Sequence, residues 1–302
     1  MQEIFKSKIG GQAVIEGIAM RGPQETCLAV RLPDGSMHTE MHPTRKNPTR
    51  KIPIVRGAVA MILSLIDGYK YLMKAADFAY PEEAEKAETD EKAKRKKERE
   101  ESWVGVLSGV LGGLLAIVLF MVLPTAVTGL LARFVPLGGW KAVVEGVLKL
   151  VFFFLYLFLV TRMKDIHRVF EYHGAEHKTI ACYEHGEELT VENVRKFSRF
   201  HPRCGTSFLF IVIIVSIIIG SFLPWGSRLV GALLKVLCLP VAMGFSYEII
   251  QYAGAHDNWF ARALSAPGLL VQRLTAFEPD DSMIEIGIAS LVAVIPAGGE
   301  QG

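Results

Sequence analysis

Four long apolar stretches are the feature that most restricts how this chain can fold. They run approximately over residues 103–130, 142–160, 207–223 and 229–250. Since roughly 20 helical residues cross the hydrocarbon core of a bilayer, each stretch reaches or approaches spanning length. The chain is 51% hydrophobic and only 21% charged, which is unusual for a soluble protein of 302 residues. The sequence therefore predicts an α-helical integral membrane protein with about four transmembrane helices in two hairpins.

Basic residues are unevenly distributed around these stretches and predict an orientation. Lys and Arg are unfavourable to translocate, so they collect on the cytoplasmic side. Residues 161–206 carry eight of them, whereas the first turn carries only Arg133 and Lys141 and the second only Arg228. The first residues also lack the apolar region of a secretory signal. We therefore expect a multi-pass protein of the cell membrane with both termini in the cytoplasm.

The regions outside the apolar stretches predict smaller elements. Residues 12–42 contain short β-prone runs around an Asp34-Gly35 turn, which predicts a small cytosolic β element. Residues 54–74 have a helical pattern whose apolar part is too short to span, which favours core packing or an interfacial position. Residues 82–101 are mostly charged and predict a solvated helix or linker. After the last stretch we expect two short amphipathic helices, the second beginning near Pro279.

These features divide the sequence into six parts. They are a β element with an amphipathic helix (1–80), a charged linker (81–102), a first transmembrane hairpin (103–160), a cytosolic loop (161–206), a second hairpin (207–251) and cytosolic amphipathic helices (252–302). The formal net charge of +2 is too small to indicate nucleic acid as a partner. The expected partner is the lipid bilayer, and the oligomeric state stays open.

The cytosolic loop contains the motif His173-Gly-Ala-Glu176-His177, which has the form H-x-x-E-H. On a helix, His173 and His177 lie on one face, so both imidazoles can reach one metal ion, and Glu176 borders that face. The pattern suits zinc, with the two histidines as ligands and Glu176 accepting a proton from water on the metal. The alternative is a polar loop that merely contains histidines, since Gly174 weakens the helix on which the geometry depends.

Two further positions are candidates for completing such a metal site. Glu248 lies near the cytosolic end of the fourth apolar stretch, where a carboxylate is costly against lipid and seeks a partner. We expect it to be the third ligand, although a simple interfacial carboxylate is the alternative. His201 and Cys204, three residues apart, are possible additional ligands, or their Pro-Arg-Cys-Gly turn only leads into the next helix.

Charged residues also occur inside the apolar stretches. Glu145 and Lys149 are four residues apart and predict an ion pair, and Lys235 is expected to extend its ammonium group towards the interface. Structural pairing is favoured here over a transport pathway.

Several motifs together resemble a known family. They are GGQAVIEGIAMRGP, YHGAEHKTIACYE, HPRCGTSF, YEIIQYAGAH and APGLLVQRLTAFEPDD, and they cover nearly the whole chain in order. The chain resembles the YqhQ-type bacterial membrane proteins, a family of unknown function described as predicted metal-dependent enzymes. This resemblance implies that the N-terminal motif belongs to the same functional unit. We expect close backbone approach at its glycines to let Glu16 or Arg21 face the site, with a plain β-turn as the alternative.

The sequence thus leads to two classes of function. The first is a membrane metal-dependent hydrolase that acts on a membrane-associated substrate, with zinc on His173, His177 and Glu248 and with Glu176 as the general base. The second is a non-catalytic membrane scaffold or a transporter that uses the same polar cluster. A coordination position open to water would favour the enzyme, and a closed site of four ligands would favour the scaffold.

Overall fold

A four-stranded antiparallel sheet forms from residues 10–43 in the computed structural model, which describes residues 5–81, 107–222, 228–256 and 258–296. The strands are β1 (Gly10–Val14), β2 (Gly17–Arg21), β3 (Glu25–Arg31) and β4 (Met37–Pro43), and they pair in chain order. The predicted β element and its Asp34-Gly35 turn are confirmed. Gly35 has a φ of 83°, a left-handed conformation that glycine adopts without steric cost.

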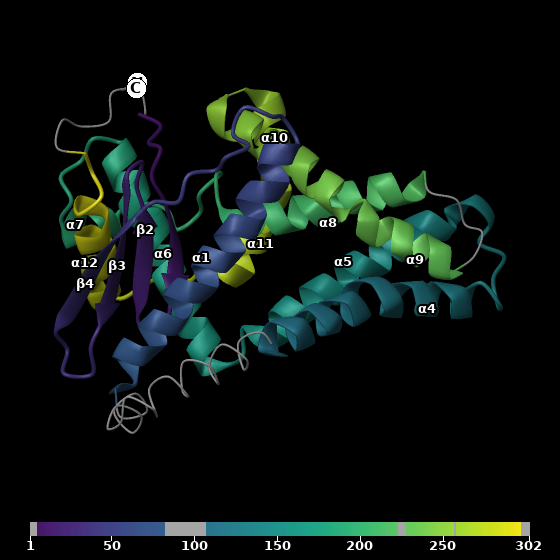
Figure 1. Ribbon diagram of the computed structural model, residues 1–302, viewed down its shortest axis with the longest axis horizontal. Coiled ribbons are helices and arrows are strands. Elements are labelled where there is room, and N and C mark those ends of the chain that lie inside the picture. The colour runs from purple at the N-terminus through teal and green to yellow at the C-terminus, as the bar shows by residue number, and fades with distance from the viewer. Residues whose placement is uncertain (1–4, 82–106, 223–227, 257, 297–302) are drawn as a thin grey trace. The chain divides into compact units, whose positions relative to one another are not determined.

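Helices cover both faces of this sheet (Figure 1). One face packs against α6 (Lys164–Glu184) and α12 (Asp281–Val292), and the other packs against α1 (Val55–Ala79). The core on the first side includes Ile18, Met20, Cys27 and Ala29, whereas their sequence neighbours Ala19, Leu28 and Val30 lie in the core beneath α1. Because successive side chains of a strand point to opposite faces, β2 and β3 are buried on both sides.

This double coverage explains the composition of the strands. A strand buried on both faces needs apolar residues at consecutive positions, which accounts for the runs in β2 and β3. The edge strand β4 has the sequence MHTEMHP, and its residues are exposed or half-buried. On α1, Tyr71 and Ala75 are buried against the sheet, which is the core packing expected as one of the two alternatives for this helix.

The same unit contains the helices that follow α6 and those near the C-terminus. The described residues within 1–80, 160–211 and 243–302 cluster together, and they include α7 (Val191–Arg195), α11 (Trp259–Thr275) and parts of α8 (Gly205–Ser221) and α10 (Leu239–Ala255). The prediction that α12 begins near Pro279 is confirmed, because Asp280 caps it by accepting a hydrogen bond from the Met283 N–H.

The second unit contains the two most apolar helices. It comprises residues 81–159 and 212–242, of which residues 82–106 and 223–227 lie outside the described ranges. The first helix runs over Leu107–Leu131 and includes a π-helical segment, η1 (Val118–Val122), followed by α4 (Leu123–Leu131). After the short 3-10 turn η2 (Gly138–Trp140), the chain returns in α5 (Lys141–Val160). Phe120 of the first helix contacts Phe153 and Tyr156 of α5.

Only these two helices, among the described residues, are long and apolar enough to cross a membrane. The prediction of four transmembrane helices in two hairpins is therefore wrong. The expected third span is α8, which has 17 residues, and Phe208, Phe210 and Ile211 in its first half are buried by protein. The expected fourth span is divided at Cys238 into α9 (Arg228–Leu237) and α10, just before Pro240, which has no backbone N–H to donate.

Protein burial explains why the apolar pattern was misleading. An apolar run can be buried either in the core of a folded unit or in lipid. A run of intermediate length does not show which of these environments surrounds it. The predicted charged linker over residues 82–101 lies outside the described residues.

Candidate metal centre

The helix α6 brings the two histidines of the H-x-x-E-H motif together, as predicted. The ring centroids of His173 and His177 are 4.3 Å apart, and both side chains are buried. Gly174, which weakens an isolated helix, has a tertiary role here. A Cβ atom at this position would lie 1.9 Å from the carbonyl oxygen of Phe277, so only glycine permits this packing.

Backbone carbonyl groups fix the orientation of both imidazole rings. The Nδ1 atom of His173 lies 2.6 Å from the carbonyl oxygen of Thr275, and the Nδ1 atom of His177 lies 2.6 Å from that of Arg199. A carbonyl oxygen can only accept, so each Nδ1 carries the proton and donates it. Each Nε2 atom is then available to a ligand, which is the arrangement in which proteins orient histidines that bind metals.

Cys204 joins the histidines from the loop that precedes α8. Its Sγ atom lies 3.2 Å from Nε2 of His173, and the ligand atoms of His173, His177 and Cys204 all lie within 4.8 Å of one another. Burial opposes ionisation of the thiol, but the charges of the two histidines and their hydrogen bonds outweigh burial and lower the pKa of Cys204 well below its ordinary value. This environment favours the thiolate, the form in which cysteine binds metals.

The carboxylate of Glu176 is held beside this group by the first strand. Its Oε1 atom accepts a hydrogen bond of 2.9 Å from the N–H of Gly11. A Cβ atom at Gly11 would lie 2.9 Å from the Cγ and Cδ atoms of Glu176, so a larger residue would displace the carboxylate. The predicted close backbone approach at the N-terminal glycines therefore occurs at Gly11, and its partner is Glu176.

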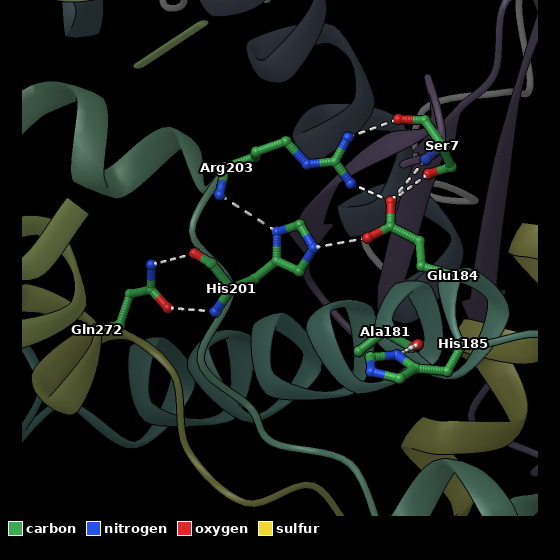
Figure 2. Close-up of polar contacts among 7 residues, drawn as sticks. All are labelled: Ser7, Ala181, Glu184, His185, His201, Arg203 and Gln272. Carbon is green, nitrogen blue, oxygen red and sulfur yellow. Dashed lines mark hydrogen bonds and ion pairs between the residues drawn. The ribbon is translucent and has the colours of Figure 1, made fainter. Parts of the chain in front are cut away.

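His201 is engaged at both ring nitrogens, as Figure 2 shows, and it is not part of the group of His173, His177 and Cys204. Its Nδ1 atom accepts from the backbone N–H of Arg203 at 3.4 Å, and its Nε2 atom lies 3.5 Å from Oε2 of Glu184. Burial, the largest cause, lowers the pKa of His201, which favours the neutral ring. With Nδ1 accepting, Nε2 carries the proton, so neither nitrogen is directed to a metal.

Glu184 is the centre of a buried polar network that sequence reasoning missed (Figure 2). Its Oε1 atom accepts from the N–H of Ser7 at 2.9 Å, from the hydroxyl group of Ser7 at 2.8 Å and from the guanidinium group of Arg203. Arg203 also donates to the carbonyl oxygen of Ser7 at 2.6 Å. The network ties the N-terminal segment to the loop that carries Cys204. Its sequence signals were the polar HPRCG motif and the position of Glu184 close to the H-x-x-E-H motif.

Gln272 of α11 holds the same loop from its other side. Its amide accepts from the N–H of His201 at 2.8 Å and donates to the carbonyl oxygen of His201 at 2.7 Å, as Figure 2 shows. It also donates to the hydroxyl group of Ser207 at 2.9 Å. Gln272 is fully buried, so these bonds are shielded from water and fix the backbone on both sides of Cys204.

The other residues predicted for the site lie elsewhere or play other parts. The carboxylate of Glu248 binds Arg56, with contacts of 2.8 and 2.5 Å, and it does not line the cavity that borders His173, His177 and Cys204. Glu16 lies in the turn between β1 and β2, where it pairs with Arg168 and accepts from the hydroxyl group of Tyr172 at 3.1 Å. Arg21 lines the cavity and donates to the carbonyl oxygen of Arg45 at 2.6 Å.

A cavity of about 250 Å³ borders the three possible ligands. Glu176 and the backbone of Gly10 and Gly11 form part of its wall, and Arg21 and Asp67 contribute charged groups. A molecule in this cavity would meet Nε2 atoms, a thiol and a carboxylate together. The arrangement can bind a cation and position water or a small polar group beside it.

Comparisons with known proteins identify the relatives of the chain. Residues 52–297 match the family described as Protein of unknown function (DUF1385). The chain is 33% identical over 287 residues to Uncharacterized protein YqhQ from Bacillus subtilis (strain 168), covering 93% of this chain and 90% of that protein. The chain belongs to this family. The family description assigns no activity, and no solved structure matches the chain with significance.

The polar network around Glu184 predicts a specific pH dependence of stability. Burial alone would raise the pKa of Glu184, but the hydrogen bond from His201 and the charge of Arg203 lower it to about 2. The unfolded value is about 4.3. The carboxylate therefore stabilises the fold fully above the unfolded value, and this contribution is lost as the pH falls towards the folded value.

We expect Glu184→Gln to lower the free energy of unfolding at pH 7 by about 1–3 kcal/mol, because Arg203 loses its buried ionic partner. The difference between wild type and variant, measured as melting temperature in a neutral detergent, should narrow as the pH falls below about 4.3. Glu192→Gln is the control, since the Glu192 side chain is 84% exposed and should change stability little at any pH. An effect of Glu184→Gln that does not depend on pH would contradict the ionic role.

Proposed function

We propose that this protein is a membrane-anchored, metal-dependent hydrolase in which His173, His177 and Cys204 bind a divalent cation, most suitably zinc. The observation that carries the proposal is the group of three buried ligand atoms within 4.8 Å of one another. Zinc–nitrogen and zinc–sulfur bonds of roughly 2.0–2.3 Å at tetrahedral angles separate neighbouring ligands by about 3.5 Å. The spacing between His173 and Cys204, 3.2 Å, is close to that value.

The bonds to the Nδ1 atoms support the same assignment. Each imidazole is fixed by a carbonyl oxygen 2.6 Å away, so little ordering of these side chains would be needed when a cation binds. Glu248, the ligand expected from the sequence, is replaced in this proposal by Cys204.

The cavity supports a catalytic role over a purely structural one. Three protein ligands leave a fourth position in a tetrahedral zinc site, and the cavity of about 250 Å³ borders these ligands. Glu176 lines the same cavity and is fixed by the Gly11 N–H, so it would accept the proton of an attacking water molecule. A closed scaffold site would instead require a fourth protein ligand.

A second candidate function is thiol chemistry without a metal. The Sγ atom of Cys204 and the Nε2 atom of His173 are 3.2 Å apart, the arrangement of an activated cysteine nucleophile and its base. Measurement of bound metal separates the two functions directly, because a thiol nucleophile would be alkylated rapidly and would carry no metal.

Membrane anchoring rests on the two apolar helices of the second unit. In the most apolar window of Leu107–Leu131 only 6% of the residues are buried, and in that of Lys141–Val160 only 22% are buried. The acyl chains of lipids would cover the exposed apolar side chains of these two helices. Residues 161–206, which follow the hairpin, contain eight basic residues, and basic residues favour the cytoplasmic side. Both ends of the hairpin would then be cytoplasmic, and so would the candidate metal centre.

Metal content is the first test of this proposal. The purified wild type should contain about one zinc ion per chain, the number that one three-ligand site holds. His173→Ala with His177→Ala should lose it, whereas His185→Ala, an exposed histidine of the same helix region, should retain it. After replacement by cobalt, Cys204→Ser should lose the thiolate charge-transfer absorption, and Cys182→Ser, another buried cysteine, should keep it. Metal that survives the double histidine variant would rule out the assigned ligands.

The role of Glu176 is tested by a conservative change. Glu176→Gln keeps an oxygen for the Gly11 N–H but cannot accept a proton, so we expect the metal to remain bound while hydrolysis falls by about 10²–10⁴-fold. The readouts are metal content and cleavage of a panel of fluorogenic esters and peptides presented in detergent micelles. Glu171→Gln is the control, because the Glu171 carboxylate pairs with His167 and does not line the cavity. Full activity of Glu176→Gln would exclude the general-base role, and loss of metal would make Glu176 a ligand.

The orientation is tested by labelling in intact cells. A cysteine at Phe134, which is 78% exposed in the turn between the two apolar helices, should react with an impermeant maleimide added outside. A cysteine at the exposed Glu187 should react only after the membrane is permeabilised. Both residues are exposed and lie outside helices and strands. Reaction of the Glu187 position in intact cells would show the opposite orientation.

A further inference from the structure

The helix α1 has a second apolar face in addition to the one that packs on the sheet. Tyr71 and Ala75 are buried against the sheet, but six large hydrophobic residues of the same helix are between 42% and 57% exposed. At 3.6 residues per turn their positions fall within about 100° of the helix circumference, so they form one stripe. This outer stripe consists of Val55, Ile62, Leu65, Ile66, Tyr69 and Met73.

The exposed charged residues in and before α1 are of one sign. Between residues 44 and 73, all of which the structure describes, every exposed charged residue is basic. Asp67, the acidic residue of this range, is half-buried, pairs with Arg45 and lines the cavity of the candidate metal centre. An apolar stripe accompanied by basic residues is typical of a helix that lies in the interface of an anionic bilayer. The basic residues are Arg45, Lys46, Arg50, Lys51 and Lys70.

The connection between α5 and α6 holds the unit that contains α1 close to a membrane. Three residues, 161–163, separate the end of α5 at Val160 from the start of α6 at Lys164. This connection spans at most about 14 Å, counted as four steps of about 3.6 Å. Since α5 crosses the bilayer in the proposed function, α6 begins within that distance of its end. The helices α6 and α1 belong to the same compact unit, so this unit lies at the bilayer surface.

On the basis of the membrane anchoring in the proposed function, we propose that α1 lies in the interface of the cytoplasmic leaflet. Acyl chains cover its outer stripe, and anionic head groups contact the basic residues. The side of α1 opposite the stripe contains Ser64, Asp67 and Tyr71, which line the cavity beside the candidate metal centre. One helix diameter, about 10–12 Å, then separates this cavity from the lipid.

The test uses the full-length protein in lipid nanodiscs, with a photoreactive benzophenone amino acid in place of one residue at a time. Replacement of Tyr69, on the outer stripe, should give crosslinks to phospholipid. Replacement of Phe158, a 46% exposed residue of α5, reports membrane anchoring. Replacement of Glu192 of α7, whose side chain is 84% exposed, is the control and should give no lipid crosslinks. The crosslinked products are identified by mass spectrometry.

The pattern of crosslinks separates failure of this proposal from failure of the anchoring. Lipid crosslinks at Tyr69 and Phe158 support the proposal. Lipid crosslinks at Phe158 without any at Tyr69 would overturn it and leave the anchoring intact, as would crosslinks from Tyr69 to residues 107–160 in place of lipid. Equal lipid crosslinking at Tyr69 and Glu192 would also overturn it. Absence of lipid crosslinks at both Tyr69 and Phe158 would contradict the anchoring itself and the proposal with it.

An apolar variant tests the contribution of the stripe. Ile66→Gln should lower the yield of lipid crosslinks at Tyr69 at least about threefold, because an aliphatic side chain no longer contacts lipid. Val292→Gln is the matched control, since it changes another exposed aliphatic residue of the same unit, in α12, and should leave the yield unchanged. The melting temperature reports whether each variant is folded. An equal yield in the two folded variants would exclude the outer stripe as a lipid contact.

A charge variant tests whether the bilayer surface is anionic. The triple change Lys46→Gln, Arg50→Gln and Lys51→Gln should lower the crosslinking yield at Tyr69 in nanodiscs that contain phosphatidylglycerol, because the attraction to anionic head groups is lost. The yield in nanodiscs of phosphatidylcholine alone should not change. An unchanged yield of the triple variant in both kinds of nanodisc would overturn the assignment of an anionic lipid partner.

Discussion

The burial of the α6 segment from Tyr172 to Ile180 is the constraint on which the candidate metal centre depends. Every residue from Tyr172 to Ile180 is buried, although this segment includes two histidines, a glutamate, a lysine and a threonine. Buried polar groups are costly unless they are hydrogen-bonded. The surrounding elements supply these bonds: β1 binds Glu176, the last residue of α11 binds His173, and the loop after α7 binds His177. Core packing and site geometry are therefore the same set of contacts.

Local periodicity explains the parts of the structure that the sequence predicted correctly. Two histidines four residues apart lie on one helix face wherever the helix packs, so the pairing of His173 and His177 needed no tertiary information. The Asp34-Gly35 turn and the Asp280 cap are likewise local signals. The expected weakening of the helix by Gly174 was also a local argument. The structure shows that glycine is required at this position for contact with the backbone at Phe277, in a distant segment.

The third ligand could not be predicted in the same way because it depends on tertiary folding. Glu248 was placed near the histidines because a topology of four spans, oriented by the basic residues, brought the end of the fourth span to the cytosolic side. That topology is wrong, because α8 is short and the following stretch is divided into α9 and α10. The carboxylate of Glu248 instead pairs with Arg56, which lies 192 residues earlier in the chain. The sequence made Cys204 a candidate ligand only through its position. Its choice over His201 as the third ligand depends on the hydrogen bonds that occupy both ring nitrogens of His201.

Charge balance also bears on what the candidate metal centre could hold. With a cation bound, two neutral imidazoles, one thiolate and the carboxylate of Glu176 would carry a formal charge of −2, which a divalent cation would neutralise. Because an uncompensated charge in a low-dielectric environment is costly, such a group of side chains favours a ligand first by the sign and magnitude of its charge. Its convergent nitrogen and sulfur atoms then suit a compact metal ion.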